Sequence, residues 1–125
     1  MIITGKYPKL RMRRSRKTDW MRRLVRENSL SSNDFILPIF VTEGKNKKIP
    51  IKTMPEVFRY SVDKLGQIVD RALKLKIPMV AIFPQTNSGL KDSYGSEALN
   101  ENNLVCKAIR KIKDKYKNEI GIMTD

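Results

Sequence analysis

The side chains of this sequence that could do chemistry are concentrated in one long polar segment. Residues 83–100 read FPQTNSGLKDSYGSEALN and carry several hydroxyls, two glycines and the Lys91–Asp92 pair. An apolar run precedes the segment and a helix-like run follows it, and a plain connection between such elements needs only a few residues. The segment could serve catalysis, or its residues could only shape a turn. For Gly95–Ala98 we favour the turn, because glycine permits a positive φ and Ser and Glu suit the residues before a helix.

Asp125 and Cys106 are the other candidates. Asp125 ends an apolar run, EIGIMTD, and chemistry in α/β proteins collects at the carboxyl ends of strands. From the residues alone, we favour an acid without a catalytic role. The chain has one cysteine and no histidine, which excludes an internal disulfide and a Cys/His zinc cluster. Cys106 falls at an apolar helix position, which favours a buried, inert thiol.

Positive charge is concentrated at the start of the chain. Of the net charge of +13, residues 1–26 contribute +9, because ten Lys and Arg stand there against Asp19 alone. Such a segment could bind phosphates of a nucleic acid, an anionic membrane or another subunit. It lacks aromatic residues interleaved for base stacking, since Trp20 lies on an apolar helix face. No signal peptide or membrane-spanning run is found, so we expect a reducing, cytoplasmic setting.

The apolar pattern predicts an α/β fold. Residues 1–34 form a basic arm with a helix that Thr18 caps and that ends near Asn28. Residues 35–125 alternate strands and helices, with a hairpin inside residues 42–60 and helices capped by Ser61 and Asn100. Apolar runs predict buried strands near residues 35–41, 78–83 and 119–124.

These segments, taken in order, carry a family resemblance. ILPIFV follows the basic arm, and then come MP-x-V-x-R-x-S, VAIFP, LKD-x-x-GSEA-x-N and a closing I-x-TD. From about Arg11 to Asp125 this order resembles the porphobilinogen synthases, also called delta-aminolevulinic acid dehydratases. The resemblance implies a (β/α)8 TIM barrel, of which the arm and the first three strands (βαβαβ) are present. It also implies a homo-oligomer, an octamer, in which the arm docks on a neighbouring subunit.

The resemblance further implies a hydro-lyase of haem and tetrapyrrole biosynthesis. The enzyme condenses two 5-aminolevulinate molecules to porphobilinogen with loss of water, using two Schiff-base lysines and zinc or magnesium. We expect those lysines, the metal loop and the substrate-carboxylate groups to lie beyond Asp125, so the segment should be inactive and bind no metal. Lys91 belongs to the LKD motif instead, and Asp125 matches an active-site acid. The alternatives are a small basic nucleic-acid-binding α/β protein and a module that serves assembly only.

Overall fold

The computed structural model describes residues 5–11 and 13–124, and Asp125 lies outside these ranges. The chain separates into two compact units, residues 1–30 and residues 31–125. The second unit contains every β-strand of the described residues. It therefore holds the framework that positions the candidate site.

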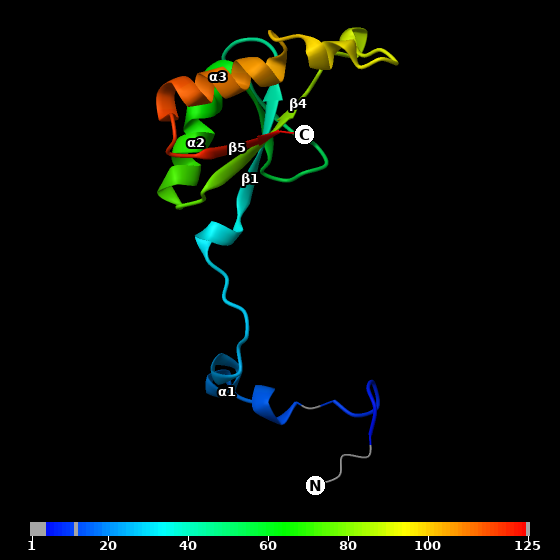
Figure 1. Cartoon of the computed structure of the whole chain (residues 1–125), viewed down its shortest axis with the longest axis vertical. Coiled ribbons are helices and arrows are strands. Elements are labelled where there is room, and N and C mark those ends of the chain that lie inside the picture. The colour runs from blue at the N-terminus through cyan, green and yellow to red at the C-terminus, as the bar shows by residue number, and fades with distance from the viewer. Residues whose placement is uncertain (1–4, 12, 125) are drawn as a thin grey trace. The chain divides into compact units, whose positions relative to one another are not determined.

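Five strands form one sheet in the second unit (Figure 1). They are β1 (Ile36–Thr42), β2 (Lys48–Pro50), β3 (Phe58–Ser61), β4 (Met79–Pro84) and β5 (Gly121–Thr124). Their order across the sheet is β2-β3-β1-β4-β5. β1, β4 and β5 run parallel, β3 pairs in parallel with the other edge of β1, and β2 runs antiparallel to β3. The predicted hairpin is present as β2 and β3.

Two helices link the parallel strands and cover one face of the sheet. α2 (Leu65–Lys74) precedes β4, and α3 (Leu104–Tyr116) joins β4 to β5. Each helix repeats apolar residues every three to four positions, which places one stripe against the strands. The alternation of strands and helices confirms the predicted α/β class. The core between the helices and the sheet is formed by Ile39, Val41, Leu65, Val69, Ala72, Val80, Ile82, Leu104, Ala108, Ile112, Tyr116 and Ile120.

The helix caps of the second unit differ from the prediction. The sequence predicts Asn100 as the cap of α3, but Asn103 caps it, with its Oδ1 accepting a hydrogen bond of 2.8 Å from the Cys106 N–H. Asn100 instead accepts from the Asn102 N–H at 2.9 Å. A 3-10 turn (Val62–Lys64) separates Ser61 from α2, and the Ser61 hydroxyl accepts from the Lys47 N–H at 2.8 Å.

The first unit contains a 3-10 turn (Arg14–Arg16) and one short helix, α1 (Asp19–Leu24). The predicted helix reached Asn28, so α1 ends earlier than expected. Thr18 occupies the predicted N-cap position, but its side chain makes no cap hydrogen bond among the described residues. No residue of α1 is buried, and a six-residue helix without packing is not stabilised beyond its own hydrogen bonds.

Candidate functional site

The carboxyl ends of β1, β4 and β5 meet at one edge of the sheet, as parallel strands require. The segment between β4 and α3 lies next to this edge and helps to enclose a cavity of about 370 Å³. Its lining includes the thiol residue Cys106, two carboxylate residues and two hydroxyl residues, which are Glu43, Glu97, Thr86 and Thr124. Cys106 is half-buried in this wall, so the prediction of a buried thiol is wrong. The stripe of α3 that meets the sheet runs through Leu104 and Ala108, and Cys106 lies beside it.

The polar segment at this edge is shaped by its own hydrogen bonds. The Asp92 carboxylate accepts from the backbone N–H groups of Tyr94 at 3.1 Å and Ser96 at 2.9 Å. These bonds, above all the one from the Ser96 N–H, lower the pKa of Asp92. Gly95 has φ +66°, the left-handed conformation in which a side chain is strained. These contacts support the turn interpretation of Gly95–Ala98.

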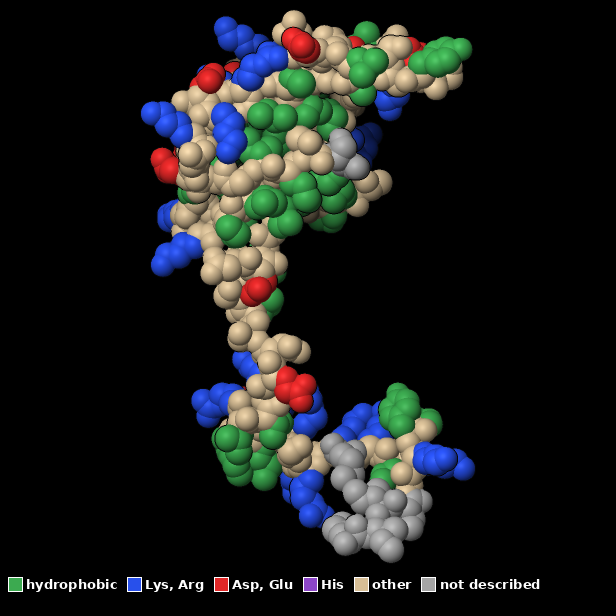
Figure 2. All heavy atoms as spheres, in the orientation of Figure 1, with side chains coloured by type: hydrophobic (Ala, Val, Ile, Leu, Met, Phe, Trp, Pro, Cys, Tyr) green, Lys and Arg blue, Asp and Glu red, His purple; other side chains and the backbone are tan. Residues whose placement is uncertain are grey.

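Among the described residues, no helix packs on the opposite face of the sheet, and the side chains of this face are mostly apolar. Neighbouring residues of a strand point to opposite faces, so Phe40 points away from the helices that bury Ile39 and Val41. The Phe40 ring stacks on that of Phe83, with centroids 5.6 Å apart. Met123 lies on the same face and is 43% exposed. Figure 2 shows hydrophobic side chains gathered over the strands, whereas Lys and Arg lie mainly on the side of α2 and α3. An apolar face of this kind fits the packed interior of a barrel.

A polar cluster on the covered side joins the two helices. The Tyr116 hydroxyl lies 2.6 Å from Asp70 Oδ1 and 3.0 Å from the Gly66 carbonyl oxygen, and it accepts from Lys115 Nζ at 2.8 Å. The Tyr116 hydrogen bond lowers the pKa of Asp70, with the Lys115 cation adding to the effect. Burial, and then the Asp70 hydrogen bond, raises the pKa of Tyr116. The cluster stabilises the helix pair, and it lies outside the strand ends.

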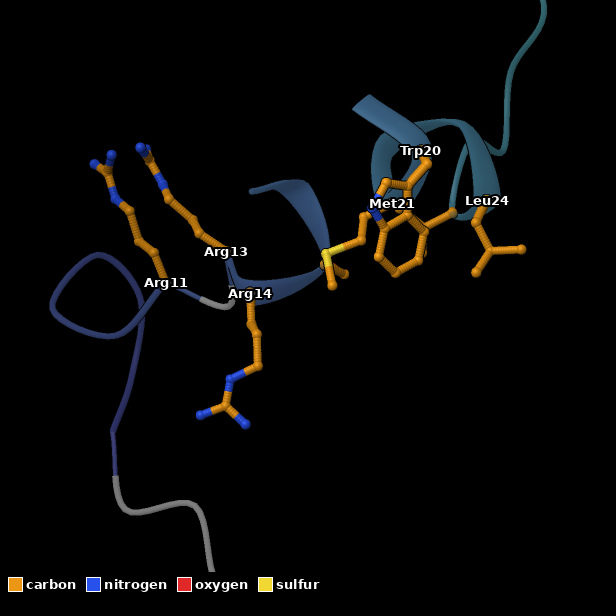
Figure 3. Close-up of a pocket in the computed structure, with 8 residues that line it drawn as sticks. Arg11, Arg13, Arg14, Trp20, Met21 and Leu24 are labelled. Carbon is orange, nitrogen blue, oxygen red and sulfur yellow. The ribbon is translucent and has the colours of Figure 1, made fainter. Parts of the chain in front are cut away.

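The first unit has a surface hollow of its own, of about 650 Å³ (Figure 3). Trp20, Met21 and Leu24 of α1 line it, and Figure 3 shows the Trp20 and Met21 side chains close together. Trp20 is 56% exposed and Leu24 77% exposed. Arginines stand at its rim, from Arg11, Arg13 and Arg14. An exposed apolar centre with a cationic rim is typical of a protein-docking surface rather than of a catalytic site.

Of the two residues that the sequence analysis singled out for the site, Asp125 and Lys91, the structure describes only Lys91. Asp125 lies outside the described residues, so its proposed role stays a prediction. Lys91 is exposed in the polar segment. Within residues 5–11 and 13–124, no group of three or more His, Cys, Asp or Glu side chains is placed to hold a metal ion. Within the same described ranges, no helix is long and apolar enough to cross a membrane.

The fold and the site at the strand ends define a class: an α/β protein with a mostly parallel sheet, as in the opening strands of a TIM barrel. The sequence profile of delta-aminolevulinic acid dehydratase matches residues 9–125, and the chain belongs to this family.

Similar proteins carry the same name. The delta-aminolevulinic acid dehydratase of Bradyrhizobium diazoefficiens is 50% identical over 116 residues, which is 93% of this chain and 33% of that protein. The protein of that name from Ruminiclostridium josui is 38% identical, over 92% of this chain and 55% of its own length. The crystal structure of delta-aminolevulinic acid dehydratase (porphobilinogen synthase) from Toxoplasma gondii ME49, in complex with the reaction product porphobilinogen, superposes with a TM-score of 0.81.

The Toxoplasma match has 30% identity and covers 93% of this chain but 32% of the other. The chain therefore spans about a third of the Bradyrhizobium and Toxoplasma proteins and about half of the Ruminiclostridium protein. What matches is a partial TIM barrel. The sheet order explains why the sequence predicts this fold well. Apart from the hairpin of β2 and β3, the strands follow one another along the chain as β1, β4 and β5, and they are neighbours in the sheet in the same order.

Proposed function

We propose that this chain supplies the arm and the first strands of a porphobilinogen synthase, which condenses two 5-aminolevulinate molecules to porphobilinogen with loss of water. The observation that carries the proposal is the superposition with the product-bound Toxoplasma enzyme, at a TM-score of 0.81 over 93% of this chain. The family match over residues 9–125 supports it independently.

In this proposal the segment provides scaffold, and the reacting lysines come from later strands. A lysine becomes a nucleophile at neutral pH when desolvation and neighbouring cations lower its pKa. The apolar open face around Phe40 and Phe83 is suited to excluding water from a closed barrel. Asp125 is proposed as an acid near those lysines, at the carboxyl end of the strand that begins at Gly121. The 125-residue chain alone is proposed to be inactive.

The metal of the complete enzyme, zinc or magnesium, is proposed to bind outside this segment. The described residues do not fit such an ion, because no cluster of three or more ligand side chains is found among them. What this segment does for the reaction is to hold the strands and exclude water.

The proposal includes assembly of several copies through the arm, as an octamer, in the cytoplasm. The exposed Trp20 and Leu24 with their arginine rim support docking on another protein surface. A division of the chain into an arm of residues 1–34 and a barrel part of residues 35–125 belongs to the same proposal.

A chimera tests the function. Residues 1–125 of this chain replace the matching third of the Bradyrhizobium diazoefficiens relative, and the pyrrole product formed from 5-aminolevulinate is measured colorimetrically. We expect turnover by the chimera and none by the 125-residue chain above a buffer blank. A folded chimera without turnover, beside an active Bradyrhizobium parent, would contradict the proposed function. Sustained turnover by the chain alone would contradict its proposed inactivity.

A further inference from the structure

Arg59 is a cation on the open face of the sheet. It lies on β3 directly opposite Phe40 of β1, and directly opposite residues of paired strands share a face. Phe40 points away from the helices, so Arg59 does too. Across the sheet, the same row contains Phe83 on β4 and Ile49 on β2.

The surroundings of Arg59 are apolar. Arg59 is half-buried, and its neighbours in the row are Ile49 and the stacked Phe40–Phe83 pair. Within the described part of the chain, its guanidinium makes no ion pair and no side-chain hydrogen bond. A partly desolvated guanidinium favours a carboxylate partner, because its planar fork donates two parallel hydrogen bonds to the two oxygens.

Arg59 is also distinctive among the strand residues. The described strands contain one other charged residue, Lys48. Lys48 pairs with Tyr60, which lies on the helix-covered face, and its Nζ stands 4.4 Å from the centroid of the Phe58 ring. The open face of the strands therefore carries a single charge in the described part of the chain.

The position of this charge along the strands is equally informative. Phe40 is two residues from the end of β1, and Phe83 is one residue from the end of β4. Arg59 thus lies in the row next to the carboxyl ends of the strands, where TIM barrels bind their substrates. Its face becomes the barrel interior when the remaining strands close the sheet.

We propose that Arg59 binds a substrate carboxylate at the mouth of the barrel. This inference rests on the proposed function, since 5-aminolevulinate carries one carboxylate and porphobilinogen carries two. It adds a carboxylate-binding residue within this segment to those expected beyond Asp125. The alternative partner is an acidic side chain from the rest of the protein, which would make Arg59 structural.

The test uses the chimera with Arg59→Gln and Arg59→Lys, and with Lys48→Gln as the matched control on the other face. Inhibition of turnover is measured with 4-oxopentanoate, which is 5-aminolevulinate without its amino group, and with its methyl ester, which has no carboxylate. We expect Arg59→Gln to weaken inhibition by the acid about tenfold and to leave inhibition by the ester unchanged. Arg59→Lys should recover part of the loss, and Lys48→Gln should change neither.

Equal inhibition constants in Arg59→Gln and the unsubstituted chimera would overturn the inference. An equal loss for acid and ester would overturn it as well, because a structural role affects both ligands. If Arg59→Gln does not fold, the acid-to-ester ratio of Arg59→Lys decides in the same way. An inactive unsubstituted chimera would contradict the proposed function instead, and calorimetric binding of the same two ligands to the folded chimera would then test Arg59.

Discussion

Tyr116 connects the two helices through a single hydroxyl. Its proton can go to Asp70 Oδ1 at 2.6 Å or to the Gly66 carbonyl at 3.0 Å, but only to one of them at a time. Tyr116 is 5% exposed, so water cannot replace these bonds easily. The hydroxyl should therefore contribute measurably to the stability of the folded barrel.

Replacing Tyr116 by Phe in the chimera should lower the free energy of unfolding by about 1 kcal/mol, the usual net value of one hydrogen bond. Urea unfolding followed by circular dichroism measures the change. Tyr94→Phe is the matched control, because Tyr94 is 90% exposed and its hydroxyl makes no hydrogen bond among the described residues. Equal unfolding free energies in Tyr116→Phe and the control would contradict the assigned role.

The same cluster predicts a dependence of stability on pH. The pKa of Asp70 is lowered from 3.8, chiefly by the Tyr116 hydrogen bond, so its charged form stabilises the folded state. The stabilisation by the charged Asp70 is complete at a pH above the ordinary pKa of an aspartate. It is lost as the pH falls through the lowered pKa of Asp70 in the folded state. The stability difference between the chimera and its Asp70→Asn variant should be constant from neutral pH to about pH 5 and should shrink below that. Urea titrations across this range measure it, and a difference that grows on acidification would contradict the assignment.

Asp92 should order the polar segment rather than the core. Its Oδ1 accepts hydrogen bonds from the N–H groups of both Tyr94 and Ser96, and Asp92→Ala removes this shared acceptor. We expect faster amide hydrogen exchange at these two positions and unchanged exchange at Val69 and Ile112 in the core. Asn102→Ala serves as a control just after this segment, because it leaves both bonds in place. Unchanged exchange at Tyr94 and Ser96 would show that the segment is held by other contacts.

At the scale of the elements, the sequence predicts what depends on local pattern. The apolar runs predict β1, β4 and β5 to within two residues, because buried parallel strands read as continuous apolar segments. The helix caps are less predictable from the sequence. Asn100 and Asn103 have the same side chain, and the packing of α3 decides which of them is its N-cap residue. The sequence alone does not predict the role proposed for Arg59. The face that Arg59 takes depends on the pairing of β3 with β1, which no local pattern encodes.

The basic arm is the element for which charge alone leaves two partners open. We expect the chain to bind DNA and RNA only weakly near physiological salt, because the apolar hollow beside Trp20 fits a protein surface better than a phosphate backbone. Binding through several phosphates would weaken by about one log unit per log unit of salt for each phosphate. Fluorescence anisotropy with labelled oligonucleotides at several salt concentrations measures this. Tight, sequence-selective binding near physiological salt, lost on changing Arg13, Arg14 and Arg16 to Gln, would favour the nucleic-acid-binding alternative.

At the scale of the whole molecule, the sheet of the second unit has helices packed on one face only among the described residues. The helix-covered face has a closed core that includes Ile39, Val80 and Ile112, each no more than 1% exposed. The other face is bare, with Ile36 at 46% and Met123 at 43% exposed. A closed barrel would fill this face with side chains and would also pair the edge of β5.

The most direct test of this partial-barrel account is the behaviour of the purified 125-residue chain on its own. Covering a Leu, Ile or Phe side chain is worth roughly 1.5–3 kcal/mol, so several uncovered ones offset much of a net stability of about 5–15 kcal/mol. Size-exclusion chromatography with light scattering at several concentrations, followed by thermal melting, provides the measurement. We predict self-association that grows with concentration and no cooperative melting of a monomer. A compact monomer that melts cooperatively would show that the segment is a complete domain, and it would contradict the account.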